Sequence, residues 1–153
     1  MVKDNQNQLL NKAIALAVIS YENKYDHNGP SILYPLSVMF ALPQTACIDT
    51  KIVTVLHGLD PADVCGHGFS VAVSHALALL RPKDNVSYAH NIVALSGSNI
   101  ASTVKLAYLK YDNDLSNKEY ISKEDIDNMA LYHASYKYLT DEITYNQFLK
   151  LVA

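Results

Sequence analysis

Hydrophobic residues recur at helical spacing along most of the chain. Near the N-terminus the apolar positions repeat every three or four residues, which predicts a largely buried helix over about residues 5–24. The same spacing predicts further helices over residues 35–42, 50–59, 69–80, 86–95, 100–109, 122–139 and 142–152. No segment keeps the apolar–polar alternation of a half-buried strand. We therefore expect an all-α fold, with residues 1–153 forming a single domain.

Residues with preferred roles at helix ends place several of the predicted boundaries. Asp60 precedes Pro61, which fits a short helix capped by an aspartate and begun by a proline. Pro35 fits the first turn of its helix, where a missing N–H costs no hydrogen bond. Asp49 and Asn99 stand just before two further apolar runs, so we expect each of them to cap a helix.

The C-terminal region combines a helix start with negative charge. Ser122 and Asp125 resemble a capping box, with aspartate in place of the usual glutamate or glutamine. The region's carboxylates favour either a solvated face or a docking surface for a basic partner. They belong to Asp112, Asp114, Glu119, Glu124, Asp125 and Asp127. Tyrosines 132, 136 and 138 pack in the core or form a homo-oligomer contact, since tyrosine is enriched at interfaces.

Composition excludes several classes of protein. Half of the 153 residues are hydrophobic and 18% are charged, which is typical of a globular chain and not of a disordered one. The net charge is −3 and no basic stripe is present, so we expect no nucleic-acid partner. The longest apolar run, residues 13–19, is too short for a membrane span, and the polar N-terminus lacks a signal-peptide pattern. With only two scattered cysteines, these features predict a cytoplasmic protein.

Two groups of residues suggest chemistry. Cys65, His67 and His75 resemble part of a soft-metal site, but nothing supplies two more ligands at zinc spacing, so we interpret the histidines as ordinary core or surface residues. The more informative feature is a histidine at the end of an apolar helix. His57 follows the run 52–56 and is itself followed by Gly58.

Four segments, in order, resemble the motifs of one enzyme superfamily. Residues 29–38 look like its segment GxPYxxHPxxV, and residues 55–62 look like LLHDxxED. Residues 78–92 resemble ALTR…SYxxYI, and residues 104–116 resemble VKLADLKHNxDLS. The superfamily is that of the HD-domain metal-dependent phosphohydrolases, in the small branch that hydrolyses guanosine tetra- and pentaphosphate alarmones. The resemblance covers about residues 13–139 and implies the HD-type helical bundle.

The resemblance implies a manganese centre of which this sequence keeps little. In the family, two histidines and two aspartates hold Mn²⁺, which acidifies the attacking water, and a glutamate–aspartate pair positions that water. The four ligand positions fall on Tyr34, His57, Gly58 and Tyr108, and the acid–base pair falls on Pro61 and Ala62. A single imidazole without a carboxylate does not hold Mn²⁺, a hard ion that prefers oxygen ligands. We therefore expect no metal, no cofactor and no catalysis.

Aromatic side chains are predicted to fill the former metal pocket. By the family's topology, Tyr34, Tyr108 and Tyr111 converge beside His57 and Gly58. Three rings there would fill volume and hydrogen-bond one another or the imidazole. The resemblance thus predicts a plugged pocket, and drift after loss of selection is the alternative that leaves the same vacant ligand positions.

Three functions remain open from the sequence. The first is a pseudoenzyme, an inactive HD-domain protein that acts as a protein-interaction or regulatory module and would suit a phage or mobile element. The second is capture of a guanosine nucleotide without hydrolysis, with contacts from Arg81, Ser87, Tyr88, Lys105 and Lys110. The third is a pyrophosphohydrolase with a rebuilt site. That site would use His57, Asp60, Asp63 and Asp112, although residues 60 and 63 are better explained as helix-start residues.

Overall fold

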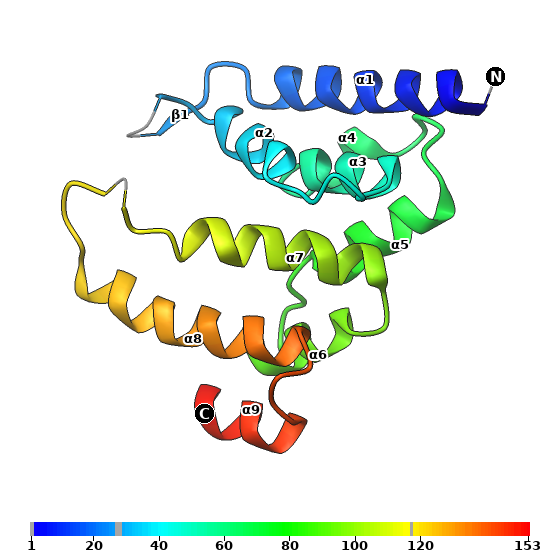
Figure 1. The fold of residues 1–153 in the computed structure, drawn as a ribbon. Helices are drawn as coiled ribbons and strands as arrows, with labels where there is room; N and C mark the ends of the chain where they lie inside the picture. The colour runs from blue at the N-terminus through cyan, green and yellow to red at the C-terminus, as the bar shows by residue number, and fades with distance from the viewer. Residues whose placement is uncertain (1, 27–28, 117) are drawn as a thin grey trace. The chain divides into compact units, whose positions relative to one another are not determined.

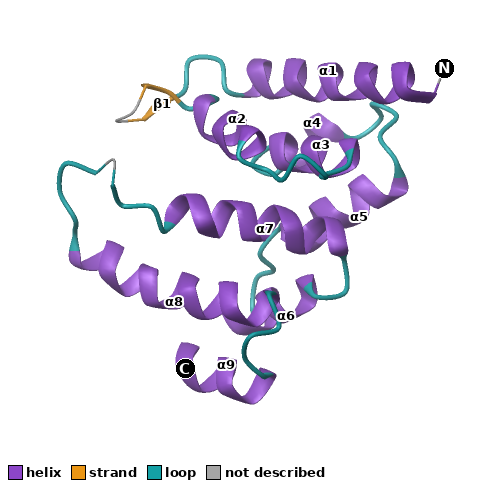
Figure 2. Cartoon of the chain, viewed as in Figure 1, coloured by secondary structure: helices purple, strands orange, loops and turns teal. Residues whose placement is uncertain are grey.

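The computed structural model of the protein describes residues 2–26, 29–116 and 118–153. These residues form nine helices and one pair of two-residue strands, which confirms the predicted all-α class (Figure 1; the strands are orange in Figure 2). None of the described helices is long and apolar enough to cross a membrane. The chain divides into two compact units, Met1–Arg81 (unit 1) and Pro82–Ala153 (unit 2).

Unit 1 contains five of the described helices and the strand pair. Its elements are α1 (Val2–Ser20), β1 (Tyr25–Asp26), β2 (Gly29–Pro30), α2 (Leu33–Phe40), α3 (Ile48–Leu56), α4 (Pro61–Val64) and α5 (Val71–Leu80). The two strands are antiparallel, with Tyr25 opposite Pro30 and Asp26 opposite Gly29. Pro35 lies in the first turn of α2, as predicted, where its missing N–H costs no hydrogen bond.

Helix α3 is the central helix of unit 1. It lies against α1, α2 and α5, and residues 52–56 are all buried. Its two buried hydroxyls both have partners: Thr54 Oγ1 donates to the Thr50 carbonyl at 2.8 Å, and Thr50 Oγ1 lies 3.2 Å from Cys47 Sγ. An apolar helix whose buried polar groups have nearby partners can be buried on most of its surface at little cost.

A stripe of small residues lets α1 lie close to α3. Ala13 and Ala17 are fully buried and stand four residues apart, on one face of α1. Tyr21 follows four residues later, just beyond the end of the helix at Ser20. Its backbone N–H still donates to the Ala17 carbonyl at 2.9 Å, so the chain keeps its helical path to this point. The stripe therefore places Tyr21 on the side of α1 that faces α3.

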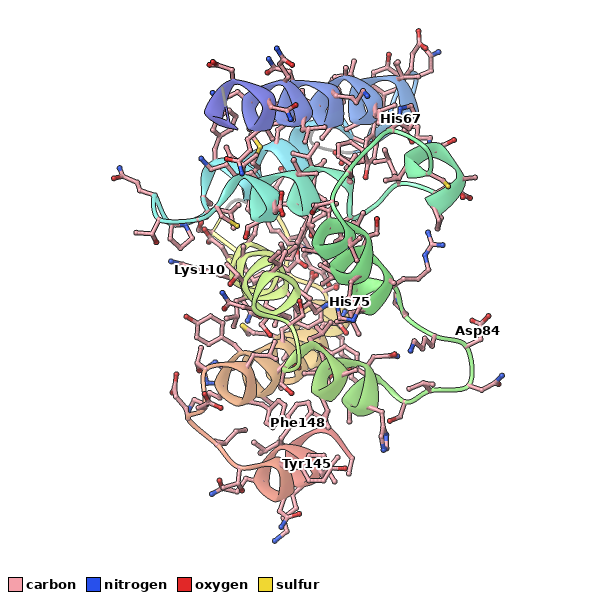
Figure 3. The ribbon with its side chains drawn as sticks, turned by 90° about the vertical axis from the view of Figure 1, so that its right-hand side faces the viewer. His67, His75, Asp84, Lys110, Tyr145 and Phe148 are labelled. Carbon is pink, nitrogen blue, oxygen red and sulfur yellow. The ribbon has the colours of Figure 1, made fainter. Side chains whose placement is uncertain are left out.

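Unit 2 contains the remaining four described helices. They are α6 (Tyr88–Leu95), α7 (Asn99–Asp112), α8 (Lys123–Leu139) and α9 (Tyr145–Val152). Helix α8 lies against α6, α7 and α9. Phe148 is fully buried and points from α9 toward α8, where it stacks on Tyr138 with ring centroids 4.8 Å apart and planes inclined by 16° (Figure 3). This stack attaches the C-terminal helix to the rest of unit 2.

Side-chain caps begin all four described helices of unit 2. Each cap accepts a hydrogen bond from the backbone N–H three residues further along. The caps are Ser87, Ser98, Ser122 and Thr144. The predicted capping box of Ser122 and Asp125 is confirmed, and α8 ends at Leu139 as expected. The cap predicted at Asn99 is wrong, because Ser98 caps α7 and Asn99 is already helical.

Helix α3, by contrast, begins without a side-chain cap. Its N-cap residue is Cys47, whose side chain makes no capping hydrogen bond. The cap predicted at Asp49 is wrong, because Asp49 lies inside the first turn and its carboxylate accepts from the Ser70 hydroxyl at 3.0 Å. The helix ends at Leu56, three residues earlier than predicted. Packing against its neighbours fixes α3 more than the polar residues at its ends do.

Candidate functional site

His57 lies at the C-terminal end of α3, as the sequence pattern indicates. It is the C-cap residue, with φ −54° and ψ −36°, and it is half-buried. Gly58 follows in an exposed turn, which Leu59 closes by donating its N–H to the Leu56 carbonyl at 3.0 Å. The doublet that the resemblance aligns with a histidine–aspartate pair therefore stands where the buried helix reaches the surface of unit 1.

The Tyr21 hydroxyl occupies the space that a side chain at position 58 would need. A Cβ atom built on Gly58 overlaps Tyr21 Oη and lies 3.6 Å from Cζ of the same ring. Non-bonded atoms do not overlap in this way, so any side chain at position 58 forces the ring to move. The φ of Gly58 is not in the left-handed region, so close approach explains the glycine and backbone freedom does not.

Tyr21 is held beside the end of α3 as a neutral phenol. Lys24 Nζ lies 5.7 Å from the centroid of its ring, within the range of a cation–π contact. Burial raises the pKa of Tyr21 above its ordinary value of 10.0, so the hydroxyl keeps its proton at neutral pH. A protonated phenol offers a hydrogen bond and is a poor substitute for a carboxylate as a metal ligand.

The residues that the resemblance aligns with an acid–base pair lie at the start of a short helix. Asp60 caps α4, and its Oδ1 accepts from the Ala62 N–H at 2.8 Å. Pro61 is the first helical residue, and Asp63 lies in the same first turn. The prediction that residues 60 and 63 mark a helix start is therefore confirmed. All four residues are exposed, and Asp60 already accepts a hydrogen bond from the backbone.

The three tyrosines predicted to plug the pocket belong to different units. Tyr34 is a half-buried residue of α2 in unit 1. Tyr108 and Tyr111 lie in α7 of unit 2, where Tyr108 is buried and Tyr111 is exposed. Their convergence beside His57 stays a prediction.

Among the predicted nucleotide contacts, Arg81, Ser87 and Tyr88 have partners within the protein. The Arg81 guanidinium donates to the Leu59 carbonyl at 3.3 Å. Ser87 caps α6, and its Oγ lies 2.7 Å from Nδ1 of His90. Tyr88 Oη lies 3.0 Å from Ser135 Oγ. Because Ser135 donates its only hydroxyl proton to the Leu131 carbonyl (2.9 Å), Tyr88 is the donor in this pair. These bonds give the three residues structural roles.

Lys105 differs from the other predicted nucleotide contacts because it is a half-buried cation. Burial lowers the pKa of Lys105 below its ordinary value of 10.5, and nearby Asp112 opposes that shift. Burial raises the pKa of Tyr88, and Asp112 adds to that rise. Lys105, Tyr88 and Asp112 therefore share one electrostatic environment inside unit 2. Lys110, five residues along α7, is exposed and projects away from the helix (Figure 3).

Metal-ligating side chains do not gather within the described residues. In residues 2–26, 29–116 and 118–153, no three His, Cys, Asp or Glu side chains lie close enough together to hold a metal ion. His67 lies between α4 and α5, and His75 lies within α5 (Figure 3). The His67 carbonyl accepts from Lys12 Nζ at 2.9 Å, and its ring lies 6.5 Å from that of Phe69.

The sequence matches no protein-family model, and no curated protein matches it. The residue that sequence reasoning missed is Tyr21. Its place at helical spacing from Ala13 and Ala17 indicates a buried face of the first helix, but not a close approach to Gly58. Nothing in the spacing of a residue in one helix tells which residue of another helix it touches. A glycine directly after a buried helix was the only available signal.

Proposed function

We propose that the chain is a catalytically inactive relative of the HD phosphohydrolases that acts as a protein-interaction module. One observation supports the proposed lack of catalysis. The position that the resemblance assigns to a metal-binding aspartate is Gly58, and the Tyr21 hydroxyl fills the space of its missing side chain. A side chain at this position would overlap the Tyr21 hydroxyl in its present place. The packing of α1 on α3 is thus consistent with the loss of a ligand at this point.

The residues at the acid–base positions support the same proposal. Pro61 has no ionisable group, Ala62 donates its backbone N–H to the Asp60 carboxylate, and the latter serves as a helix cap. A general acid or base needs a titratable group at the reacting atoms. At the two aligned positions, Pro61 and Ala62, the chain has no titratable side chain; both residues belong to the first turn of α4.

Turnover and metal binding test the proposal directly. The full-length protein is incubated with Mn²⁺ and guanosine tetraphosphate, and released pyrophosphate is quantified. Calorimetric titration with Mn²⁺ measures binding on the same preparation. We expect no pyrophosphate above the protein-free control and no stoichiometric Mn²⁺ binding. Turnover that is lost on His57→Ala would overturn the proposal and favour the rebuilt hydrolase.

Capture of a guanosine phosphate is the second candidate, and Lys105 is the observation that favours it. A half-buried ammonium whose pKa is lowered by burial would be stabilised by a bound anion. Thermal shift against guanosine and adenosine phosphates tests this candidate. A rise in melting temperature that Lys105→Ala abolishes and Lys110→Ala preserves would favour capture, because Lys110 is an exposed lysine of the same helix.

A further inference from the structure

Four exposed apolar side chains cluster at the start of α8. We call them the α8 surface: Tyr120, Ile121, Ile126 and Met129. Tyr120 is 80% exposed and Ile126 is 54% exposed, although both are large hydrophobic residues. Isolated exposed apolar residues are ordinary, but a contiguous group of them is typical of a binding surface.

Local structure makes this group contiguous. Ser122 is the N-cap of α8, so Ile121 directly precedes the cap and Ile126 is the fourth helical residue. These two positions are the ones that pack together in a hydrophobic staple. Met129 lies three residues beyond Ile126 and therefore on the same side of α8. Tyr120 extends the group by one residue on the N-terminal side.

Two polar interactions hold the segment before α8 against its first turn. The Ser122 hydroxyl and the Asp125 carboxylate form the reciprocal bonds of the capping box, with the Asp125 N–H donating to Ser122 Oγ at 3.1 Å. Lys118 Nζ also donates to the Asp125 carboxylate as a close ion pair. The surface is therefore preorganised, which lowers the entropic cost of binding a partner.

The charge around the α8 surface identifies the kind of partner. Residues 112–127 hold six acidic and two basic side chains, a net charge of −4, whereas the rest of the chain holds nine acidic and ten basic side chains. The chain's negative charge is thus concentrated here. Asp114, Glu119 and Asp127 are exposed in this segment. Two copies of an acidic face would repel each other, and a nucleic acid would be repelled as well.

We propose that the α8 surface binds a basic amphipathic helix of a partner protein. The apolar side of such a helix would cover Ile126 and Met129, and its lysines or arginines would face the surrounding carboxylates. This inference rests on the proposed function as an interaction module and names the partner's chemistry.

A labelled peptide tests this inference with the full-length protein. The probe is a fluorescein-labelled amphipathic helix of leucine and lysine, about five turns long, and the charge control is its leucine–glutamate counterpart. Fluorescence anisotropy is expected to show binding of the lysine peptide alone. Ile126→Ser and Asp127→Lys should each weaken binding about tenfold, and added salt should weaken it further.

Matched variants on unit 1 control for non-specific adhesion. Ile19→Ser removes a side chain that is 68% exposed on α1, and Glu22→Lys reverses an exposed charge. We expect both variants to bind the lysine peptide within about twofold of the wild type. No binding of that peptide, or equal weakening by the control variants, would overturn the inference. Circular dichroism of each variant verifies folding, and all four changed positions are exposed.

Two further outcomes separate the inference from its alternatives. A self-associated protein in sedimentation that Ile126→Ser disperses would overturn the inference, because a second copy then covers the surface. Manganese-dependent turnover would overturn the proposed lack of catalysis without changing the peptide result. A wild-type protein that neither binds the lysine peptide nor hydrolyses guanosine tetraphosphate would overturn only the docking inference.

Discussion

Helices α2 and α3 of unit 1 begin without a side-chain cap, although Asp60 and Ser70 cap α4 and α5 of the same unit. All four described helices of unit 2 begin with a serine or threonine that caps them. Unit 1 compensates with apolar packing, since α3 is buried over residues 52–56 and α1 lies against it along Ala13 and Ala17. Unit 2 adds hydrogen bonds inside its core, such as Tyr88 to Ser135. The comparison indicates that apolar packing fixes the central helix of unit 1, whereas capping hydrogen bonds fix the starts of the helices of unit 2.

The largest effect is expected from a cavity at the centre of unit 1. Leu56 is 1% exposed at the end of α3, and Leu56→Ala should lower the free energy of unfolding by about 2–5 kcal/mol. Urea unfolding followed by circular dichroism measures the change. The control is Leu33→Ala, which truncates an exposed leucine of α2 and should cost less than about 0.5 kcal/mol. Equal losses in the two variants would contradict the central role of α3.

The contact between Tyr21 and Gly58 should give a coupled effect of intermediate size. Gly58→Ala introduces the Cβ that overlaps the Tyr21 hydroxyl, and we expect it to cost about 1–3 kcal/mol. In a Tyr21→Phe background the overlapping oxygen is absent, and the ring carbon at 3.6 Å is at an ordinary distance. Gly58→Ala should therefore lower the free energy of unfolding by less in this background than in the wild type. A double-mutant cycle on unfolding free energies is expected to give a coupling of about 0.5–3 kcal/mol.

A second glycine provides the control for this cycle. At Gly97 a built Cβ lies 3.7 Å from the Ala94 carbonyl oxygen, an ordinary van der Waals distance. Gly97→Ala should therefore be neutral or slightly stabilising in both backgrounds. Additivity of Gly58→Ala and Tyr21→Phe would show that the hydroxyl moves away without cost, and it would remove the main support for the proposed loss of a metal ligand.

The same contrast explains which parts of the fold could be predicted from the sequence. The capping box of Ser122 and Asp125 placed the start of α8 to the residue, because the bonds are local and their residue types are specific. The start of α3 was misplaced at Asp49, because packing sets that helix and the spacing of apolar residues leaves its ends open. The same distinction applies to the site. The place of His57 at the end of α3 is local and could be predicted, whereas the contact of Tyr21 with Gly58 joins two helices and could not.

Removal of a cap in unit 2 should have a smaller effect than a cavity in unit 1. Ser122→Ala deletes the hydroxyl that accepts from the Asp125 N–H and should cost about 1 kcal/mol. Ser74→Ala is the matched control, because Ser74 is an exposed serine within α5 and begins no helix. Urea unfolding measures both variants. A loss at Ser122 as large as that of Leu56→Ala would contradict the division between packing and capping.

The smallest expected effect is a loss of stability in acid, because the capping box of α8 includes the Asp125 carboxylate. The hydrogen bond from Lys118, together with those from Ser122, lowers the pKa of Asp125 from its ordinary value of 3.8 to about 2. A carboxylate whose pKa is lowered by folding stabilises the folded state at pH values above its ordinary pKa, and this stabilisation is lost as the pH falls through the lowered value. We therefore expect a contribution that is constant from neutral pH to about pH 4 and is lost between about pH 4 and pH 2.

Asp125→Asn should flatten this part of the profile, because an amide does not titrate. The measurement is the urea midpoint of the wild type minus that of the variant at each pH, which cancels the titration of the other carboxylates. Asp127→Asn, which removes an exposed carboxylate of the same helix, is the matched control. A pH-independent difference for Asp125→Asn would mean that the Lys118 ion pair does not stabilise the start of α8, and the α8 surface would then lack one of the two interactions that preorganise it.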